Sequence, residues 1–235
     1  MLKSVSPVRM GLLVASAVCL IFSVGFSTPS RAALISYSFN GSVATELTGS
    51  PLAGTFSFGQ SVTGGFVVDT SVPDADGGSL YGFFPGGLVS ISVDTGGYNA
   101  SGTNGLIDTA DNAAGSDAVG IAAFITAGPF VGSASVTGAS VAGLDLGGIL
   151  ISLMDSTGTA LSSDAFPNPI SLSGFDDIYG VLEFYDPQDL EADPTSLTFS
   201  LETIEVTTSV PAPAVLPLFA LGLVGLGFAR RKRAA

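Results

Sequence analysis

Basic residues are missing from the whole interior of this sequence. No Lys or Arg occurs between Arg31 and Arg230, no His occurs at all, and all 20 acidic residues lie from Glu46 to Glu205. A surface without positive charge cannot neutralise phosphates, which excludes nucleic acids and anionic lipid headgroups as ligands of this region. Internal salt bridges are excluded too, so apolar burial and backbone hydrogen bonds must stabilise the fold.

Cysteine is nearly absent and tryptophan is wholly absent. The only cysteine, Cys19, lies in an apolar run near the start, so the interior has no disulfide and no Cys/His metal site. Clefts that cleave sugars commonly stack the sugar ring on aromatic faces, Trp above all. For carboxylates such as Asp176-Asp177 and those from Asp186 to Asp193, no Arg, Lys or His is present to tune the pKa through charge. A glycosidase is therefore disfavoured, and these acids are expected to be solvated loop residues.

One short motif is shared with aspartic proteases. Asp94-Thr95-Gly96 follows an apolar alternation, but protease chemistry needs two carboxylates that share one proton. The second candidate, Asp155-Ser156-Thr157-Gly158, contains an extra residue. A single match arises readily by chance in a chain this rich in Asp, Thr and Gly. We therefore expect a non-enzymatic protein without catalytic or cofactor-binding residues, and a secreted hydrolase is the weakest alternative.

The first segment has the parts of a secretion signal. Two basic residues precede an apolar run over 10–26, and small residues at Ser30 and Ala32 fit the small-x-small rule of signal peptidase. We expect cleavage between Ala32 and Ala33, which makes 1–32 a signal peptide. The alternative is an uncleaved signal anchor, which the good cleavage site disfavours.

The final segment, 210–235, is organised like a membrane anchor. Its apolar stretch over 214–229 is short for a bilayer, but flanking residues and snorkelling arginines can extend it. An amphipathic core helix would show a polar face and this stretch has none, so we expect a transmembrane helix. Basic residues at the extreme end should stay in the cytoplasm and leave the interior of the chain outside. These residues are Arg230, Arg231, Lys232 and Arg233.

A proline motif precedes the apolar stretch, formed by Val210, Pro211, Ala212, Pro213 and Ala214. This motif, followed by a short hydrophobic helix and an arginine-rich end, resembles the sorting tail of PEP-CTERM proteins. The VPLPA-CTERM type is the most similar, and the chain departs from it at Ala212. The resemblance implies recognition by an exosortase, a membrane-embedded transpeptidase-like enzyme, and cleavage near the motif. It also implies export across the inner membrane of a Gram-negative bacterium and association with exopolysaccharide or biofilm matrix.

The interior, 33–209, alternates apolar and polar residues in many short stretches. This period of two predicts strands, most clearly over 35–39 and 197–206, where a one-residue slip predicts a β-bulge near Glu202-Thr203. Clusters of Gly, Pro and Asp predict turns between them, and no stretch has a helical period. We therefore expect an all-β fold, an antiparallel β-sandwich of the jelly-roll type, flanked by the signal helix and the C-terminal transmembrane helix. Further strands are expected over 53–58, 65–69, 88–94, 119–126, 148–154 and 180–185.

Two acidic segments are candidate calcium ligands. Asp74-Ala75-Asp76-Gly77 resembles the start of an oxygen-ligand loop, and Asp108 with Asp111-Asn112 could form another, although neither has the spacing of an EF-hand. Calcium would relieve the self-repulsion of an all-acidic domain. The main prediction is a cell-surface or matrix protein that needs no cofactor. The alternative is a calcium-assisted carbohydrate-binding module.

Overall fold

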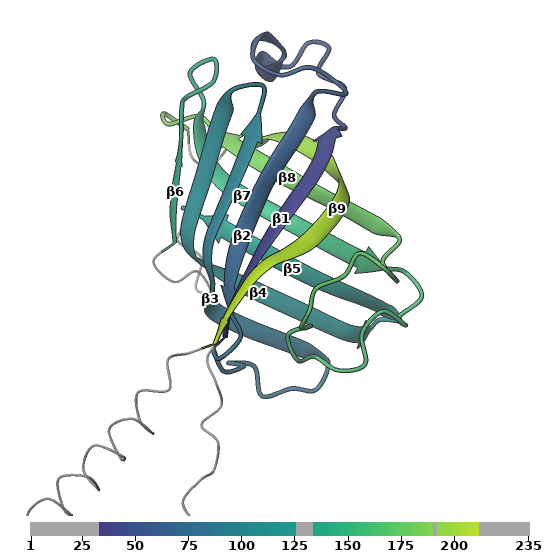
Figure 1. The fold of residues 1–235 in the computed structure, drawn as a ribbon. Coiled ribbons are helices and arrows are strands. Elements are labelled where there is room, and N and C mark those ends of the chain that lie inside the picture. Colours follow the sequence, from purple (N-terminus) through teal and green to yellow (C-terminus); the bar gives the residue numbers. More distant parts are fainter. Residues whose placement is uncertain (1–32, 126–133, 190–191, 212–235) are drawn as a thin grey trace, which may run out of the picture. The chain divides into compact units, whose positions relative to one another are not determined.

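The computed structural model describes residues 33–125, 134–189 and 192–211, which form almost entirely antiparallel β-structure (Figure 1). The predicted all-β class is therefore confirmed. A 3-10 helix, η1 (Pro51–Gly54), lies between the first two strands. The strands are β1 (Ala33–Val43), β2 (Ser61–Asp69), β3 (Tyr81–Thr95), β4 (Tyr98–Ala113), β5 (Ser116–Phe124), β6 (Ser135–Gly138), β7 (Asp145–Asp155), β8 (Asp177–Tyr185) and β9 (Thr195–Pro211).

Eight of these strands close into one barrel. Their order is β3-β2-β1-β9-β8-β7-β5-β4, β4 pairs with β3 to complete the ring, and β6 adds to β4 along 100–103. Figure 1 shows β1 and β2 running across β5, β7 and β8 at a steep angle. The β-sandwich prediction is wrong, because β3 and β4 pair along their length, from Tyr81↔Ala110 to Thr95↔Tyr98. This ladder joins two faces that a sandwich would keep as separate sheets.

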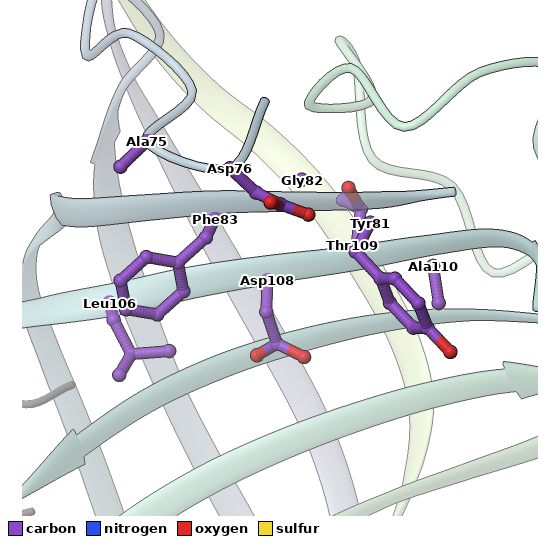
Figure 2. Close-up of a pocket in the computed structure, with 9 residues that line it drawn as sticks. All are labelled: Ala75, Asp76, Tyr81, Gly82, Phe83, Leu106, Asp108, Thr109 and Ala110. Atoms are coloured by element: carbon purple, nitrogen blue, oxygen red, sulfur yellow. The ribbon is translucent and has the colours of Figure 1, made fainter. Parts of the chain in front are cut away.

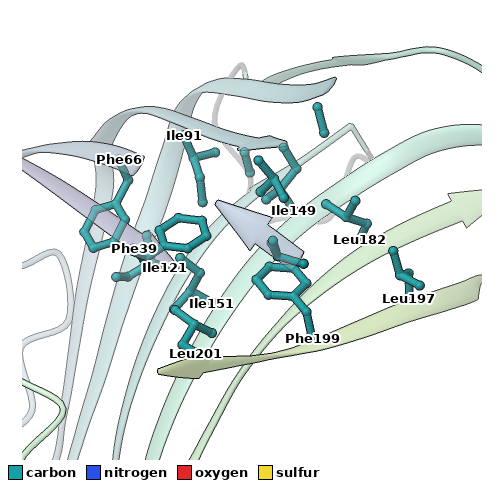
Figure 3. Close-up of a cluster of buried hydrophobic side chains, with 14 of the residues drawn as sticks. Phe39, Phe66, Ile91, Ile121, Ile149, Ile151, Leu182, Leu197, Phe199 and Leu201 are labelled. Carbon is teal, nitrogen blue, oxygen red and sulfur yellow. The ribbon is translucent and has the colours of Figure 1, made fainter. Parts of the chain in front are cut away.

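The barrel encloses one apolar core. Alternate residues of each strand point inward, and aromatic rings meet at its centre (Figure 3). The ring of Phe39 lies between those of Phe66 and Phe199, with centroids 6.4 and 6.2 Å away. All three side chains are at least 97% buried, and full burial of a Phe stabilises a fold by about 1.5–3 kcal/mol. Apolar burial thus supplies the stability that a chain interior without basic residues cannot gain from ion pairs.

The predicted bulge in β9 is confirmed. Asn40 of β1 pairs with Thr203, and the next residue, Gly41, pairs with Leu201, so Glu202 is the extra residue. A bulge bends its strand and increases the local twist. Both effects help a sheet to close into a barrel.

Most predicted strands are also confirmed, with one exception. The stretch 53–58 is not a strand, because Pro51 begins the 3-10 helix and the Ser50 side chain accepts a hydrogen bond of 3.2 Å from the Leu52 N–H. Strands β4 and β6 were not predicted. The segment Pro85-Gly86-Gly87, which has the composition of a turn, instead forms a register shift inside β3.

No helix long and apolar enough to span a membrane occurs among residues 33–125, 134–189 and 192–211. The predicted signal helix and C-terminal transmembrane helix lie outside these described residues. The same is true of Ala32, of the motif residues from Ala212 to Ala214, and of the basic residues from Arg230 to Arg233.

Candidate functional site

An open groove lies on the outer wall of the barrel, where the first part of β3 pairs with β4. Its volume is about 500 Å³. Phe83 is the register partner of Asp108 and Tyr81 is the partner of Ala110, so side chains of both strands face outward together here. We call this hollow the β3–β4 groove (Figure 2). It is lined by Ala75, Asp76, Tyr81, Gly82, Phe83, Leu106, Asp108, Thr109 and Ala110.

Alternation along β3 provides the aromatic part of the groove. Tyr81 and Phe83 stand on the outer face, whereas Gly82 and Phe84 are buried. Tyr81 is 54% exposed, so its ring is open to solvent. Two residues along a strand span about 7 Å, which spaces the two rings along the wall of the groove.

A short loop before β3 forms one rim of the groove. Oδ1 of Asp74 accepts hydrogen bonds from the backbone N–H of Asp76, at 2.9 Å, and from that of Phe83, at 2.8 Å. The N–H of Ala75 donates to the Phe83 carbonyl at 2.8 Å. These bonds tie the loop to the edge of β3 and hold Asp76 at the groove (Figure 2).

Asp108 lies in the middle of the groove. Figure 2 shows its carboxylate between the rings of Phe83 and Tyr81. The side chain is exposed, yet neighbouring atoms exclude enough water to raise the pKa of the Asp108 carboxyl, and a backbone hydrogen bond offsets only part of this effect. A partly desolvated carboxylate flanked by aromatic rings can accept hydrogen bonds from hydroxyl groups or pair with a cation.

The two segments named as candidate calcium ligands each contribute one carboxylate to this groove. Asp76 and Asp108 both line it, whereas the carboxylate of Asp74 is used by the backbone of its own loop. Residues 108–112 all belong to strand β4; Asp108 pairs with Gly120 of β5, whereas Asp111 and Asn112 lie at a register shift between the pairs of Ala110 and Ala113. The described residues contain no group of three or more acidic side chains placed to hold a metal ion. Oδ1 of Asp111 is buried without a hydrogen-bond partner in the described part of the chain, and Asp111 does not line the groove.

The protease-like motif lies at the opposite end of β3 from the groove: Asp94 and Thr95 are the last residues of β3, and Gly96 begins the turn to β4. Thr95 is buried there and its hydroxyl accepts a hydrogen bond of 3.0 Å from Nε2 of Gln60. Asp94 is exposed and lines a second hollow, of about 680 Å³, together with small residues such as Ser92 and Ser101. The motif thus has a structural role in closing the hairpin.

Two buried carboxylates lie next to each other on β5 and β7, a pairing that no sequence pattern indicates. Asp117 and Asp155 are register partners and are 0% and 2% exposed. Asp155 accepts hydrogen bonds from the Thr157 hydroxyl at 2.6 Å and from the N–H groups of Thr157 and Thr159 at 2.8 and 2.7 Å, and these hold its pKa well below the usual range. Asp117 accepts from the Leu161 N–H at 2.7 Å. Through these bonds, Asp155 and Asp117 fasten the loop after β7 to the ends of β7 and β5.

Only two residues of the predicted sorting motif fall in the described part of the chain. Val210 and Pro211 are the last residues of β9, and their backbones pair with Leu34 and Ala33 of β1. The first residue of β1 and the last residue of β9 are therefore neighbours in one ladder. No family model, no curated protein and no solved structure matches the chain.

Proposed function

We propose that this chain is a non-enzymatic protein that a Gram-negative bacterium exports, anchors through its C-terminal segment and presents at the cell surface or in the exopolysaccharide matrix. An exosortase would be its processing enzyme. The observation that carries the proposal is the pairing of Ala33 with Pro211. The barrel begins at the residue after the expected signal cleavage, and its last strand ends inside the expected sorting motif.

The position of these strand ends suits processing at a membrane surface. Because β1 and β9 are adjacent, the segments before Ala33 and after Pro211 both connect to the same end of the barrel. A signal peptidase and an exosortase would then reach their sites without unfolding the core. A sorting motif in the middle of a central strand would require that unfolding.

The charge of the barrel is compatible with an exported, matrix-associated role. All 20 acidic residues of the chain, and none of its basic residues, lie between Glu46 and Glu205. A strong net charge of one sign favours solubility and repels anionic surfaces. The barrel is therefore expected to stand clear of the lipid headgroups to which its tail would be anchored.

Substitution of both motif prolines tests the sorting step. In its own bacterium, a chain with Pro211→Ala and Pro213→Ala should accumulate in the membrane fraction and lose most of its released form, because the exosortase would no longer recognise it. Glu205→Gln, an exposed position on β9, is the matched control and should leave release unchanged. Release of the proline variant in the same amount as the unsubstituted chain would contradict exosortase processing. Recovery of the parent chain from the cytosol with both ends intact would contradict export.

The β3–β4 groove favours a second candidate function, carbohydrate binding assisted by calcium. Aromatic faces and carboxylates are the groups that hold sugar rings and their hydroxyls. Asp76 and Asp108 supply only two of the six to eight oxygen ligands that calcium takes, so water or sugar hydroxyls would have to complete the shell. A rise in Tm on addition of calcium that disappears in Asp108→Asn would support this candidate, and an unchanged Tm would contradict its calcium component.

A further inference from the structure

We propose that the β3–β4 groove binds the amine-bearing sugar units of a cationic polysaccharide. Asp108 and Asp76 would pair with ammonium groups, and Tyr81 and Phe83 would provide the faces on which the sugar rings lie. This inference names a ligand class for the carbohydrate-binding function above and rests on that function, without calcium as a requirement.

Charge complementarity determines the sign of the ligand. The chain has no basic residue between Arg31 and Arg230, so no side chain of the barrel can neutralise the two groove carboxylates. The field of the whole acidic barrel attracts cations and repels glycans that carry carboxylates or sulfates, over a range of about 10 Å at moderate salt. A polysaccharide with free amines therefore fits this groove better than an anionic one.

The groove also strengthens the pairing locally. Asp108 lies between two aromatic rings, and partial removal of water makes a hydrogen bond between its carboxylate and an ammonium group stronger than the same bond in open solvent. Charge-assisted hydrogen bonds of this kind are about twice as strong as neutral ones. The exposed ring of Tyr81 adds an apolar face and an attraction for cations.

The backbone around the groove favours a sugar over a peptide. Extended peptides often bind by adding a strand to an open sheet edge. At Phe83, β3 is paired with β4 on one side and is bonded to Asp74 and Ala75 on the other, so this edge is already occupied. A paired strand that presents ring faces suits the flat apolar face of a pyranose ring.

Isothermal titration calorimetry on the full chain in non-ionic detergent tests the proposal. The probes are a tetrasaccharide of β-1,4-linked glucosamine and its fully N-acetylated counterpart, which has the same rings without the charges. A lysine tetramer serves as the peptide probe. Measurements are made at low salt and at a pH where carboxylates are ionised and amines are protonated.

The glucosamine tetramer should bind at least about tenfold more tightly than the N-acetylated one, because the charge-assisted bonds are lost in the latter. Asp108→Asn should weaken its binding by about tenfold or more, and Tyr81→Ala should weaken it several-fold. Asp94→Asn makes the same charge change at the far end of β3 and should leave binding within about twofold.

Equal binding of the two tetrasaccharides would overturn the amine preference while leaving a carbohydrate-binding function in place. Absence of binding by both would overturn both. Binding of the lysine tetramer as tight as that of the glucosamine tetramer, together with no effect of Tyr81→Ala, would overturn recognition of a sugar. If Asp94→Asn weakened binding of the glucosamine tetramer as much as Asp108→Asn does, the tetramer would be attracted to the acidic barrel in general. That result would overturn the assignment of the binding site to this groove.

Discussion

The carboxylate of Asp108 lies against Gly120. A Cβ added at Gly120 would come within 2.2 Å of Oδ1 of Asp108, so the present position of this side chain requires a glycine there. The two residues are register partners on β4 and β5. A missing side chain on one strand therefore makes room for an acidic side chain of the next strand in the β3–β4 groove.

Gly120→Ala is expected to displace Asp108 without unfolding the barrel, because the atom in the way is the end of an exposed side chain. The affinity for the glucosamine tetramer should fall several-fold, while Tm should change by less than about 2 °C. Titration calorimetry and thermal unfolding measure the two effects. In an Asp108→Ala background, Gly120→Ala should cause no further loss of affinity, and an additional loss there would contradict the contact.

The same substitution at Gly180 is expected to destabilise the barrel, unlike the one at Gly120. A Cβ at Gly180 would lie 2.1 Å from Cζ of Phe199, whose side chain is completely buried in the core. Because the ring cannot move into solvent, Gly180→Ala should lower the free energy of unfolding by about 1–3 kcal/mol, the usual cost of overpacking a core. Urea denaturation of the two alanine variants side by side checks this contrast. If Gly180→Ala were as stable as Gly120→Ala, the core would have space for a methyl group beside Phe199, and the prediction would be wrong.

Asp155→Asn is expected to destabilise the barrel in a pH-dependent way. Hydrogen bonds, first from the Thr157 hydroxyl, hold the pKa of Asp155 below the unfolded-state value of about 3.9. A carboxyl whose pKa is lower in the folded state than in the unfolded state stabilises the fold at any pH above the unfolded-state pKa. This stabilisation is lost as the pH falls from the unfolded-state pKa to the folded-state pKa. At neutral pH the substitution should lower Tm by about 5–10 °C, and the difference should shrink below about pH 4. The exposed Asp94→Asn is the control for thermal melts across this pH range, and an equal effect of the two would contradict the role of Asp155.

Asp108→Asn should have the opposite effect on stability. Desolvation raises the pKa of Asp108, so folding disfavours its ionised form and the ionised side chain costs stability above the unfolded pKa of about 3.9. The cost disappears as pH falls below that value. Asparagine should therefore raise Tm at neutral pH by about 1–2 °C, since solvent screening limits the effect, and should give no gain in acid. A lower Tm at neutral pH would show that bonds to the carboxylate outweigh its desolvation.

The strands that could be predicted are those in which large apolar residues alternate with polar ones, such as β1 and β9. Strand β4 escaped prediction because inward positions of its first half are small, as at Ala100 and Gly102, and Gly102 leaves room for the side chains of Ala123 and Ile91. Barrel closure depends on the long ladder between β3 and β4. Because β4 could not be predicted, this ladder could not be predicted either. Segment composition therefore predicted the class and not the architecture.

The residues of the β3–β4 groove could also be predicted only in part. The chemistry of Asp76 and Asp108 identifies them as candidate ligands, but nothing in the sequence indicates that a loop residue and a strand residue line one groove. Tyr81 and Phe83 were missed because the Pro-Gly-Gly segment after them predicted a turn and hid the first part of β3. The local signal that could have revealed that strand is the enrichment in aromatic residues, which favour strands, at Tyr81, Phe83 and Phe84.

The intact mass of the protein released from the surface of its own bacterium tests export and sorting together. A mass that begins at Ala33 and ends within 210–214 is predicted, because signal peptidase and an exosortase would remove the segments on either side of the barrel. A released form that still contains residues 1–32, or that extends to Ala235, would contradict it.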